Sequence, residues 1–123
     1  LMKIINTANI ACGFHAGDKD TMHKSIELSK KYSISIGAHP GFADKNNFGR
    51  KRIYLTKKEL KKLILDQILI LSKIAEKKGM ELTHVKPHGA LNNMACEDYD
   101  LSLTIGETIK EFNIDLKEEV DII

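Results

Sequence analysis

The 123-residue sequence has no tryptophan, two prolines, two cysteines and no long apolar run. Its longest apolar stretch, residues 63–75, is interrupted by Asp66 and Gln67, which excludes a membrane-spanning helix there. The cysteines, Cys12 and Cys96, have neither a metal-ligand spacing nor the pattern of a disulfide framework. We therefore expect two small buried thiols in a reducing compartment. No signal peptide precedes the first predicted strand, so the expected location is cytoplasmic, with no membrane partner.

The chain also lacks a strong excess of charge of either sign. Nineteen basic residues are set against seventeen acidic ones, and the formal net charge is +2. This balance does not indicate a nucleic acid or a membrane surface as partner. A hydrophobic content of 42% and a charged content of 29% are those of an ordinary globular protein. The length predicts a single domain over residues 1–123.

Short apolar segments alternate with helical patterns along the chain. Strands are predicted at residues 3–11, 33–38 and 82–86. Helices are predicted from a cap at Asp18 or Asp20 to about residue 31, from Thr56 to about residue 78, and over residues 98–112. The connections are too long for hairpins. This β-α-β-α-β-α order therefore predicts parallel strands, in a barrel or in an open doubly wound sheet.

Local signals set several boundaries. Thr56 and Glu59 form a capping box at the start of the second predicted helix, and Gly79 marks its end. Residues 39–52 are rich in turn formers and predict a loop, and a second loop is predicted through Asn93. The apolar residues near the end of the sequence are expected to begin a further strand: Val120, Ile122 and Ile123.

Three apolar segments each end at a histidine that lies beside glycine or proline. They are NIACGFHAGD, IGAHPGF and VKPHGAL, and their histidines are His15, His39 and His88. Each histidine follows a predicted parallel strand, at the end where both barrels and open α/β sheets place their active sites. We therefore expect the three imidazoles to meet on one rim. The two remaining histidines lack this context and are interpreted as structural: His23 and His84.

Histidine acts as a general acid or base near neutral pH, or as a neutral metal ligand. Ligation of a metal by these histidines stays open, although no spacing such as H-E-x-x-H supports it. Asp18, three residues after His15, either caps a helix or turns its carboxylate toward the same rim. Lys86 points the same way as His88 in extended backbone, and a lysine at a buried strand end indicates a role.

The loop GFADKNNFGRKR contains Asp44 and the only two arginines, Arg50 and Arg52. An arginine fork suits a carboxylate or a phosphate, so Arg50 beside Gly49 predicts a contact with an anion. Arg52 fits an exposed basic loop nearly as well. Neither G-x-x-x-x-G-K-[ST] nor G-x-G-x-x-G occurs, so the sequence predicts no nucleotide cradle of these types.

Together, the motifs NIACGFHAGD, IGAHPGF.D...FGR and HVKPHGALNNMA closely resemble the LamB/YcsF family, over about residues 5–112. The resemblance implies a β/α barrel related to the glycoside hydrolase/deacetylase barrels. It also implies the activity of the first of the three subunits, A, B and C, of bacterial 5-oxoprolinase. That activity is the ATP-dependent opening of 5-oxo-L-proline to L-glutamate, together with partner subunits B and C.

Family members are longer and begin with an Asp-Leu-Asn-rich strand that this sequence does not match. We therefore interpret the chain as part of the barrel. Open sheet edges then predict self-association or low stability of the chain alone.

The resemblance and the chemistry of the side chains imply a set of catalytic residues: His15, Asp18, His39, Lys86 and His88. In this hypothesis His15 and Asp18 form the base, and His39 and His88 protonate or orient groups. Lys86 and Arg50 hold negative charge. Contacts to the lactam are expected from Asn9, Asp44, Arg50 and Asn92, and ATP is expected as the co-substrate. No residue is assigned to a metal.

Two other interpretations stay open. The related barrels suggest a metal-dependent deacetylase or carbohydrate hydrolase, with an aspartate and two histidines on a metal. Stoichiometric zinc in the purified protein would favour that enzyme. Alternatively, the chain is an assembly module that docks partner subunits without chemistry of its own. Binding of subunits B and C without turnover of the lactam would favour the module.

Overall fold

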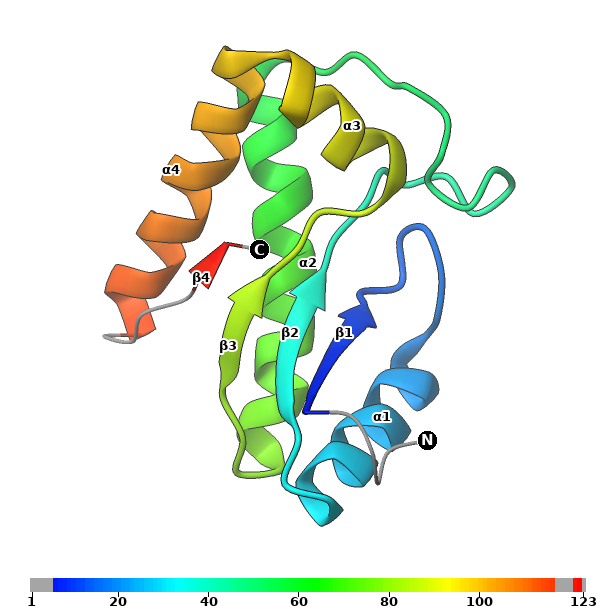
Figure 1. Ribbon diagram of the computed structural model, residues 1–123, viewed down its shortest axis with the longest axis vertical. Coiled ribbons are helices and arrows are strands. Elements are labelled where there is room, and N and C mark those ends of the chain that lie inside the picture. The colour runs from blue at the N-terminus through cyan, green and yellow to red at the C-terminus, as the bar shows by residue number, and fades with distance from the viewer. Residues whose placement is uncertain (1–5, 117–120, 123) are drawn as a thin grey trace.

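The computed structural model describes residues 6–116 and 121–122. Its elements, in chain order, are β1 (Thr7–Ala11), α1 (Lys19–Lys31), β2 (Ser35–His39), α2 (Lys57–Lys77), β3 (Leu82–Val85), α3 (Gly89–Glu97), α4 (Tyr99–Leu116) and β4 (Asp121–Ile122) (Figure 1). The predicted alternation of strands and helices is confirmed. Among the described residues, none of the helices combines the length and the apolar character needed to cross a membrane.

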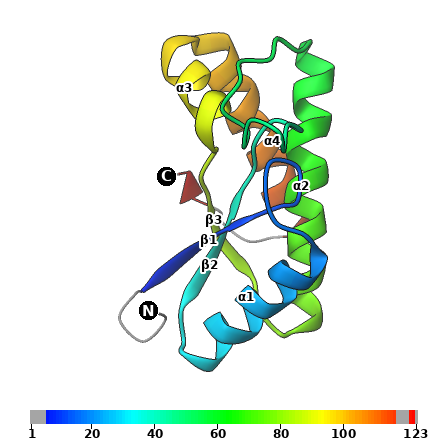
Figure 2. The ribbon, with the colours of Figure 1, turned by 90° about the vertical axis from the view of Figure 1, so that its right-hand side faces the viewer.

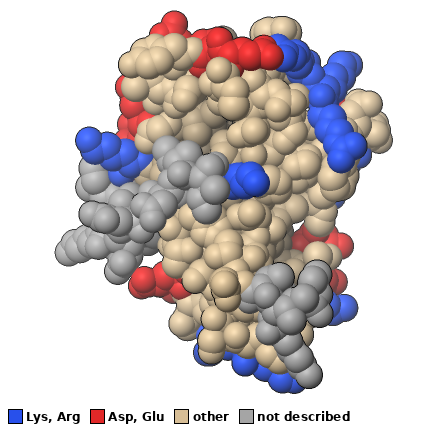
Figure 3. All heavy atoms as spheres, in the orientation of Figure 1, with Lys and Arg blue, Asp and Glu red and all other residues tan. Residues whose placement is uncertain are grey.

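The strands form one parallel sheet in the order β1-β2-β3-β4, which is also their order in the chain. Helices α1 and α2 pack against one face of this sheet, and α4 packs on α2 (Figure 2). Figure 3 views the opposite face, where uncharged atoms predominate and charged side chains lie mainly around the rim. The described chain therefore buries one face of the sheet and leaves the other without a covering layer of helices.

Helix α2 supplies the largest part of the core because its apolar residues recur on one side. Seven of its residues are buried: Leu60, Ile64, Gln67, Ile68, Leu71, Ile74 and Ala75. They meet buried residues of the sheet, among them Ile10, Ile36 and Val85. Burial of each of these larger aliphatic side chains stabilises the fold by about 1.5–3 kcal/mol before the entropy of ordering is subtracted.

Both predicted amino-terminal caps are confirmed. The Asp18 side chain accepts a hydrogen bond from the Thr21 backbone N–H at 2.8 Å and so begins α1. Thr56 Oγ1 accepts from the Glu59 N–H at 3.1 Å, while the Glu59 carboxylate accepts from the Thr56 N–H at 2.9 Å. These bonds hold the pKa of the Asp18 and Glu59 carboxyl groups below their usual range.

The expected loop through Asn93 is wrong, because α3 begins at Gly89 directly after His88. No side chain caps this helix. Instead, the Ala90 N–H donates to the Gly49 carbonyl at 3.0 Å. The partner of this helix start lies some forty residues earlier in the chain, and local sequence patterns do not reveal it.

Two strand boundaries also differ from the prediction. The second strand begins at Ser35 rather than Ser33, because Ser33 adopts a left-handed turn with φ of 55°. It then extends through His39. The first strand is described from Thr7, and residues 3–5 of its predicted span lie outside the described residues. Ile122 belongs to β4, as expected, whereas Val120 and Ile123 lie outside the described residues.

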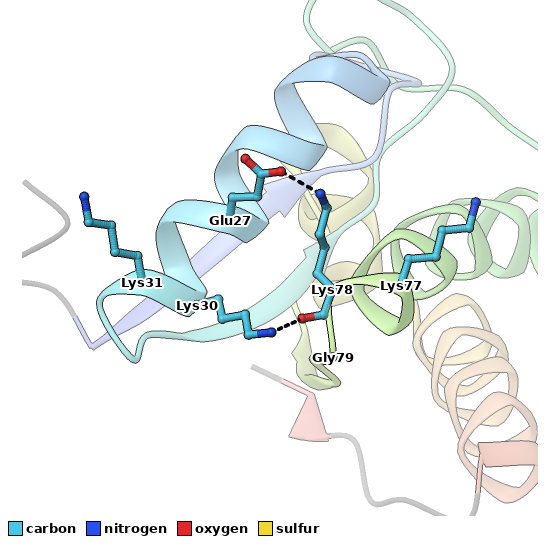
Figure 4. A pocket seen from close by; sticks show the side chains of 6 residues that line it. All are labelled: Glu27, Lys30, Lys31, Lys77, Lys78 and Gly79. Carbon is cyan, nitrogen blue, oxygen red and sulfur yellow. Dashed lines mark hydrogen bonds and ion pairs between the residues drawn. The ribbon is translucent and has the colours of Figure 1, made fainter.

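Helices α1 and α2 are joined near their carboxyl-terminal ends, away from the end of the sheet where the histidines gather (Figure 4). Lys30 Nζ donates to the Lys78 carbonyl at 2.7 Å, and Lys78 Nζ pairs with Glu27 Oε1 at 2.6 Å. Lys31 and Lys77 point away from these contacts. Both interactions are exposed, so we expect at most about 1 kcal/mol from the ion pair.

The buried polar residue of α2, Gln67, holds the segment that follows β2. Its Oε1 accepts from the Gly41 N–H at 3.0 Å, and its Nε2 donates to the Gly41 carbonyl at 2.8 Å. Nε2 also donates to the Leu63 carbonyl at 3.0 Å. One side chain thus satisfies both backbone groups of a buried glycine and fixes the path of the chain as it leaves the sheet.

We predict that Gln67→Leu lowers the free energy of unfolding by about 2–4 kcal/mol, because both polar groups of Gly41 lose their partner. Urea unfolding measures the effect. Lys73→Ala, at an exposed position of the same helix, is the control and should change stability by less than about 0.5 kcal/mol. A loss below about 1 kcal/mol for Gln67→Leu would contradict this account of Gly41.

Candidate functional site

Three imidazoles meet at the carboxyl ends of the parallel strands, as the sequence predicts. His15 follows β1, His39 ends β2, and His88 is the amino-terminal cap of α3. The rings of His15 and His88 are stacked, with centroids 3.9 Å apart and planes 9° apart. The His39 ring meets them edge-on, with its centroid 4.8 Å from that of His88 and 5.7 Å from that of His15.

A chain of polar contacts runs through two of these rings. His39 Nδ1 lies 2.5 Å from the Lys86 carbonyl oxygen, and His39 Nε2 lies 2.9 Å from His88 Nδ1. His88 Nε2 lies 2.7 Å from the Phe48 carbonyl oxygen. A carbonyl accepts but cannot donate, so the two outer nitrogens, His39 Nδ1 and His88 Nε2, are N–H donors.

The third ring, that of His15, lies between two glycines. Its side chain is 2% exposed. A Cβ atom at Gly41 would lie 2.6 Å from His15 Nδ1, and one at Gly49 would lie 2.7 Å from the His15 Cβ. Gly49 also has a φ of 70°, which side chains other than glycine rarely adopt. Among the described residues, Nδ1 of His15 has no hydrogen-bond partner although it is buried.

Burial determines the charge state of His15. Removal from water, followed by the positive neighbours His88 and His39, lowers the pKa of His15 from 6.5 to about 4. The ring is therefore neutral at physiological pH. Burial also lowers the pKa of His39, with His88 and Lys86 adding to this effect, while the bond to the Lys86 carbonyl acts in the opposite direction.

The base pair of His15 with Asp18 is not formed. Asp18 is exposed, and its carboxylate is engaged at the start of α1, whereas His15 is buried beneath the neighbouring loop. Lys45 lies near this carboxylate and contributes to its lowered pKa. Of the two roles open for Asp18 from the sequence, the structure shows the helix cap.

The cationic side chains contact the cluster differently from the expectation. Lys86 does not lie at a buried strand end: its side chain is exposed, and its backbone carbonyl is the group that contacts His39. The Arg50 guanidinium lies over the Phe48 ring at 5.4 Å. Arg52 forms an ion pair with Glu97 at 2.8 Å, on the outer side of the loop.

The remaining predicted contacts lie at different depths. Asp44 accepts from the Asn47 backbone and side-chain amides and so shapes the loop. Asn92 is half-buried in the first turn of α3, where its N–H donates to the His88 carbonyl at 3.4 Å. Asn9 lies on the face of the sheet that the described helices leave uncovered.

The two thiols differ from each other. Cys12 is buried as expected, and burial raises its pKa to about 12, so it is an inert thiol at neutral pH. Cys96 is exposed, which contradicts the expectation of a second buried thiol. It lies in the last turn of α3, on the side of that helix away from the core.

A polar row across the sheet was missed by the sequence interpretation. Asn9 of β1, Gly37 of β2 and His84 of β3 are register partners. The His84 ring passes over Gly37, and His84 Nε2 donates to Asn9 Oδ1 at 2.6 Å. A glycine between asparagine and histidine on successive parallel strands is the signal that could have revealed this row.

A pH titration tests the burial of His15. The unfolded chain takes up this proton near pH 6.5 and the folded chain only near pH 4, so the free energy of unfolding should fall as pH decreases between these values. The loss attributable to His15 should reach up to about 3 kcal/mol. Urea unfolding at several pH values measures it. His15→Gln should remove this part of the pH dependence and His23→Gln should not. An unchanged slope in His15→Gln would refute the assignment.

A double-mutant cycle tests the polar row. A Cβ at Gly37 would lie 2.2 Å from the His84 ring, so Gly37→Ala should lower the free energy of unfolding by about 1–3 kcal/mol. In the His84→Ala background the same substitution should cost at least about 1 kcal/mol less, because the obstructing ring is gone. Equal costs in both backgrounds would contradict the packing of His84 over Gly37.

Known proteins share this arrangement of sequence and fold. The LamB/YcsF family profile matches residues 1–119. The A-type subunit of 5-oxoprolinase from Rhodopseudomonas palustris strain BisB5 is 47% identical over 111 residues, which cover 89% of this chain and 44% of that protein. The A-type subunit of 5-oxoprolinase from Pyrococcus horikoshii is 45% identical over 116 residues, covering 94% of this chain and 46% of that protein.

A solved structure agrees with these relatives. The crystal structure of a lactam utilization protein from Thermus thermophilus superposes with a TM-score of 0.89 and 38% identity, over 91% of this chain and 45% of that one. The chain thus spans less than half the length of the curated relatives that it matches. Since a family profile matches nearly all of its length, the chain belongs to the LamB/YcsF family.

Proposed function

We propose that this chain acts as part of the A-type subunit of a 5-oxoprolinase. In that role it hydrolyses 5-oxo-L-proline to L-glutamate with consumption of ATP, together with partner subunits B and C. The observation that carries the proposal is the convergence of His15, His39 and His88 at one end of the sheet. This cluster lies within the segment that is shared with the 5-oxoprolinase relatives.

We further propose that residues 1–123 form one unit of a larger β/α barrel. Strands that follow one another in chain order, with helices on one face, are the arrangement of successive barrel units. A doubly wound sheet would place helices on both faces. In a barrel, the uncovered face with Asn9 and His84 would line the interior, and the remaining strands would come from residues outside this chain.

The chemistry of a five-membered lactam sets what the site must supply. Amide resonance protects the ring carbon from water, and phosphorylation of the lactam oxygen by ATP would make that carbon more reactive. Water must then lose a proton as it attacks, and the ring nitrogen must gain one as it leaves. His39 and His88, which are half-buried and reachable, are the groups that we propose for these proton transfers.

The charged groups around the cluster suit an anionic substrate. Lys86 and Arg50 are exposed cations on two segments that contact the histidines, and 5-oxoproline carries a carboxylate. We propose that these two side chains hold the substrate carboxylate or the phosphorylated oxygen. Asn9, Asp44 and Asn92 remain proposed lactam contacts from the same rim and sheet face.

A chimera tests the proposed function within a whole 5-oxoprolinase. The matching segment of the Rhodopseudomonas palustris relative is replaced by this chain, and the product is combined with partner subunits B and C. We expect 5-oxoproline to yield glutamate and ADP in equal amounts, only when ATP is present. His15→Ala in the chimera should lower turnover at least about 100-fold, and His23→Ala, outside the cluster, should not.

A folded chimera that assembles with its partners but releases no glutamate would overturn the proposed function. Unchanged turnover in His15→Ala would remove that residue from the mechanism.

A further inference from the structure

We propose that His39 and His88 hold one proton in common, so that the two rings together carry three protons and one positive charge at neutral pH. The pair would be a proton donor built into the rim of the sheet. Its charge state is a property of this chain alone. Its use in opening a lactam rests on the proposed function.

The contacts at both ends of the pair carry this inference. The Lys86 and Phe48 carbonyls can only accept, so His39 Nδ1 and His88 Nε2 must each carry a proton. The contact between His39 Nε2 and His88 Nδ1, at 2.9 Å, needs a third proton to be a hydrogen bond. Two neutral rings have only two protons, which would leave one of the three short contacts with lone pairs facing each other.

The neighbouring groups place the third proton on His88. Burial together with the positive neighbours His88 and Lys86 lowers the pKa of His39, which disfavours the charged form of that ring. His88 then donates from both nitrogens, to His39 and to the Phe48 carbonyl, and His39 donates only to the Lys86 carbonyl. Every short contact in the chain is satisfied by this one arrangement.

His15 stabilises the charge without adding to it. Its neutral ring stacks on the His88 ring and presents a π-face to the cation. The other charged group on this side is Arg50, which lies over the Phe48 ring, and that ring meets His88 edge-on at 5.3 Å. In the part of the chain that the structure describes, neither His39 nor His88 is hydrogen-bonded to a carboxylate. Carbonyl dipoles therefore stabilise the charge.

A metal ion bound by all three histidines fits this geometry poorly. By distance alone the cluster qualifies, since one nitrogen of each ring lies within 4.8 Å of the others. Imidazole binds a metal in the plane of its ring, at about 2.0–2.1 Å for zinc. The rings of His15 and His88 are stacked with nearly parallel planes. An ion in the plane of one ring lies outside the plane of the other, where no lone pair is available.

The shared proton would balance the ring opening. As water forms the new C–O bond, the C–N bond breaks and its electron pair stays on nitrogen. The pair gives its proton to that nitrogen and regains one from the attacking water, so it ends the step in its starting state. A single proton held by two rings therefore serves both as the acid and, after release, as the base.

Nitrogen-15 NMR of the histidine side chains tests the inference on this chain without substrate or partners. At neutral pH we expect His39 Nδ1 and His88 Nε2 to be protonated, with a third proton between the rings and a single proton on His15. His23, on α1, should titrate as an ordinary imidazole and serves as the reference. Two protons rather than three on His39 and His88 at neutral pH would overturn the proposal.

Removal of one ring tests whether the proton is shared. His39→Phe keeps a ring of similar shape but takes away the acceptor, so His88 should drop to one proton at neutral pH. His88 that stays doubly protonated in this variant would refute sharing. His23→Phe is the matched control and should leave the three protons of the pair unchanged. The backbone spectrum of each variant shows that it is folded.

A metal titration tests the competing occupant. After treatment with a chelator, the protein should show no stoichiometric binding of Zn²⁺ by calorimetry and no Co²⁺ absorption spectrum. One equivalent of metal, lost in His15→Gln, would overturn the shared proton in favour of a metal centre. These measurements do not involve 5-oxoproline. Three protons on the pair together with an inactive chimera would therefore refute only the proposed function.

Discussion

The packing of the His15 ring between Gly41 and Gly49 is the contact on which the rest of the site depends. It brings together the segments that follow β1 and β2, and the stacked His88 ring adds the segment that follows β3. Gln67 holds Gly41 from the core of α2. The three strand ends are thus fixed to one another through glycines that leave no room for a side chain, and the position of the imidazoles is set by the core beneath them.

Burial and backbone carbonyls together decide the electrostatics of the cluster. His15 is neutral because its ring is removed from water. His39 and His88 are oriented by the carbonyls of Lys86 and Phe48, which accept hydrogen bonds at fixed positions. In a site of low local dielectric, such backbone dipoles replace the carboxylate that usually orients a histidine. Glycine has a similar part on the uncovered sheet face, where the His84–Asn9 bond crosses Gly37.

Much of the fold and part of the site could be predicted from residue patterns. The Thr56 capping box, the helical repeat of α2 and the three histidine motifs are local signals, and each lies where it was expected. The failures are of another kind. The start of α3, the exposure of Lys86 and the role of Asp18 depend on which distant groups lie nearby, as the bond from Ala90 to the Gly49 carbonyl shows. Spacing along the chain contains no information about such partners.

The sequence by itself determined that apolar strands end in histidines flanked by glycine or proline, and parallel strands necessarily bring those ends to one edge. Only the tertiary structure decided which nitrogen of each ring meets which partner. The reason is geometric: an imidazole has two nitrogens in fixed directions, and their surroundings come from loops far apart in the chain. His15 stacks on His88 while His39 meets it edge-on, and that difference in orientation separates a proton-sharing pair from a metal centre.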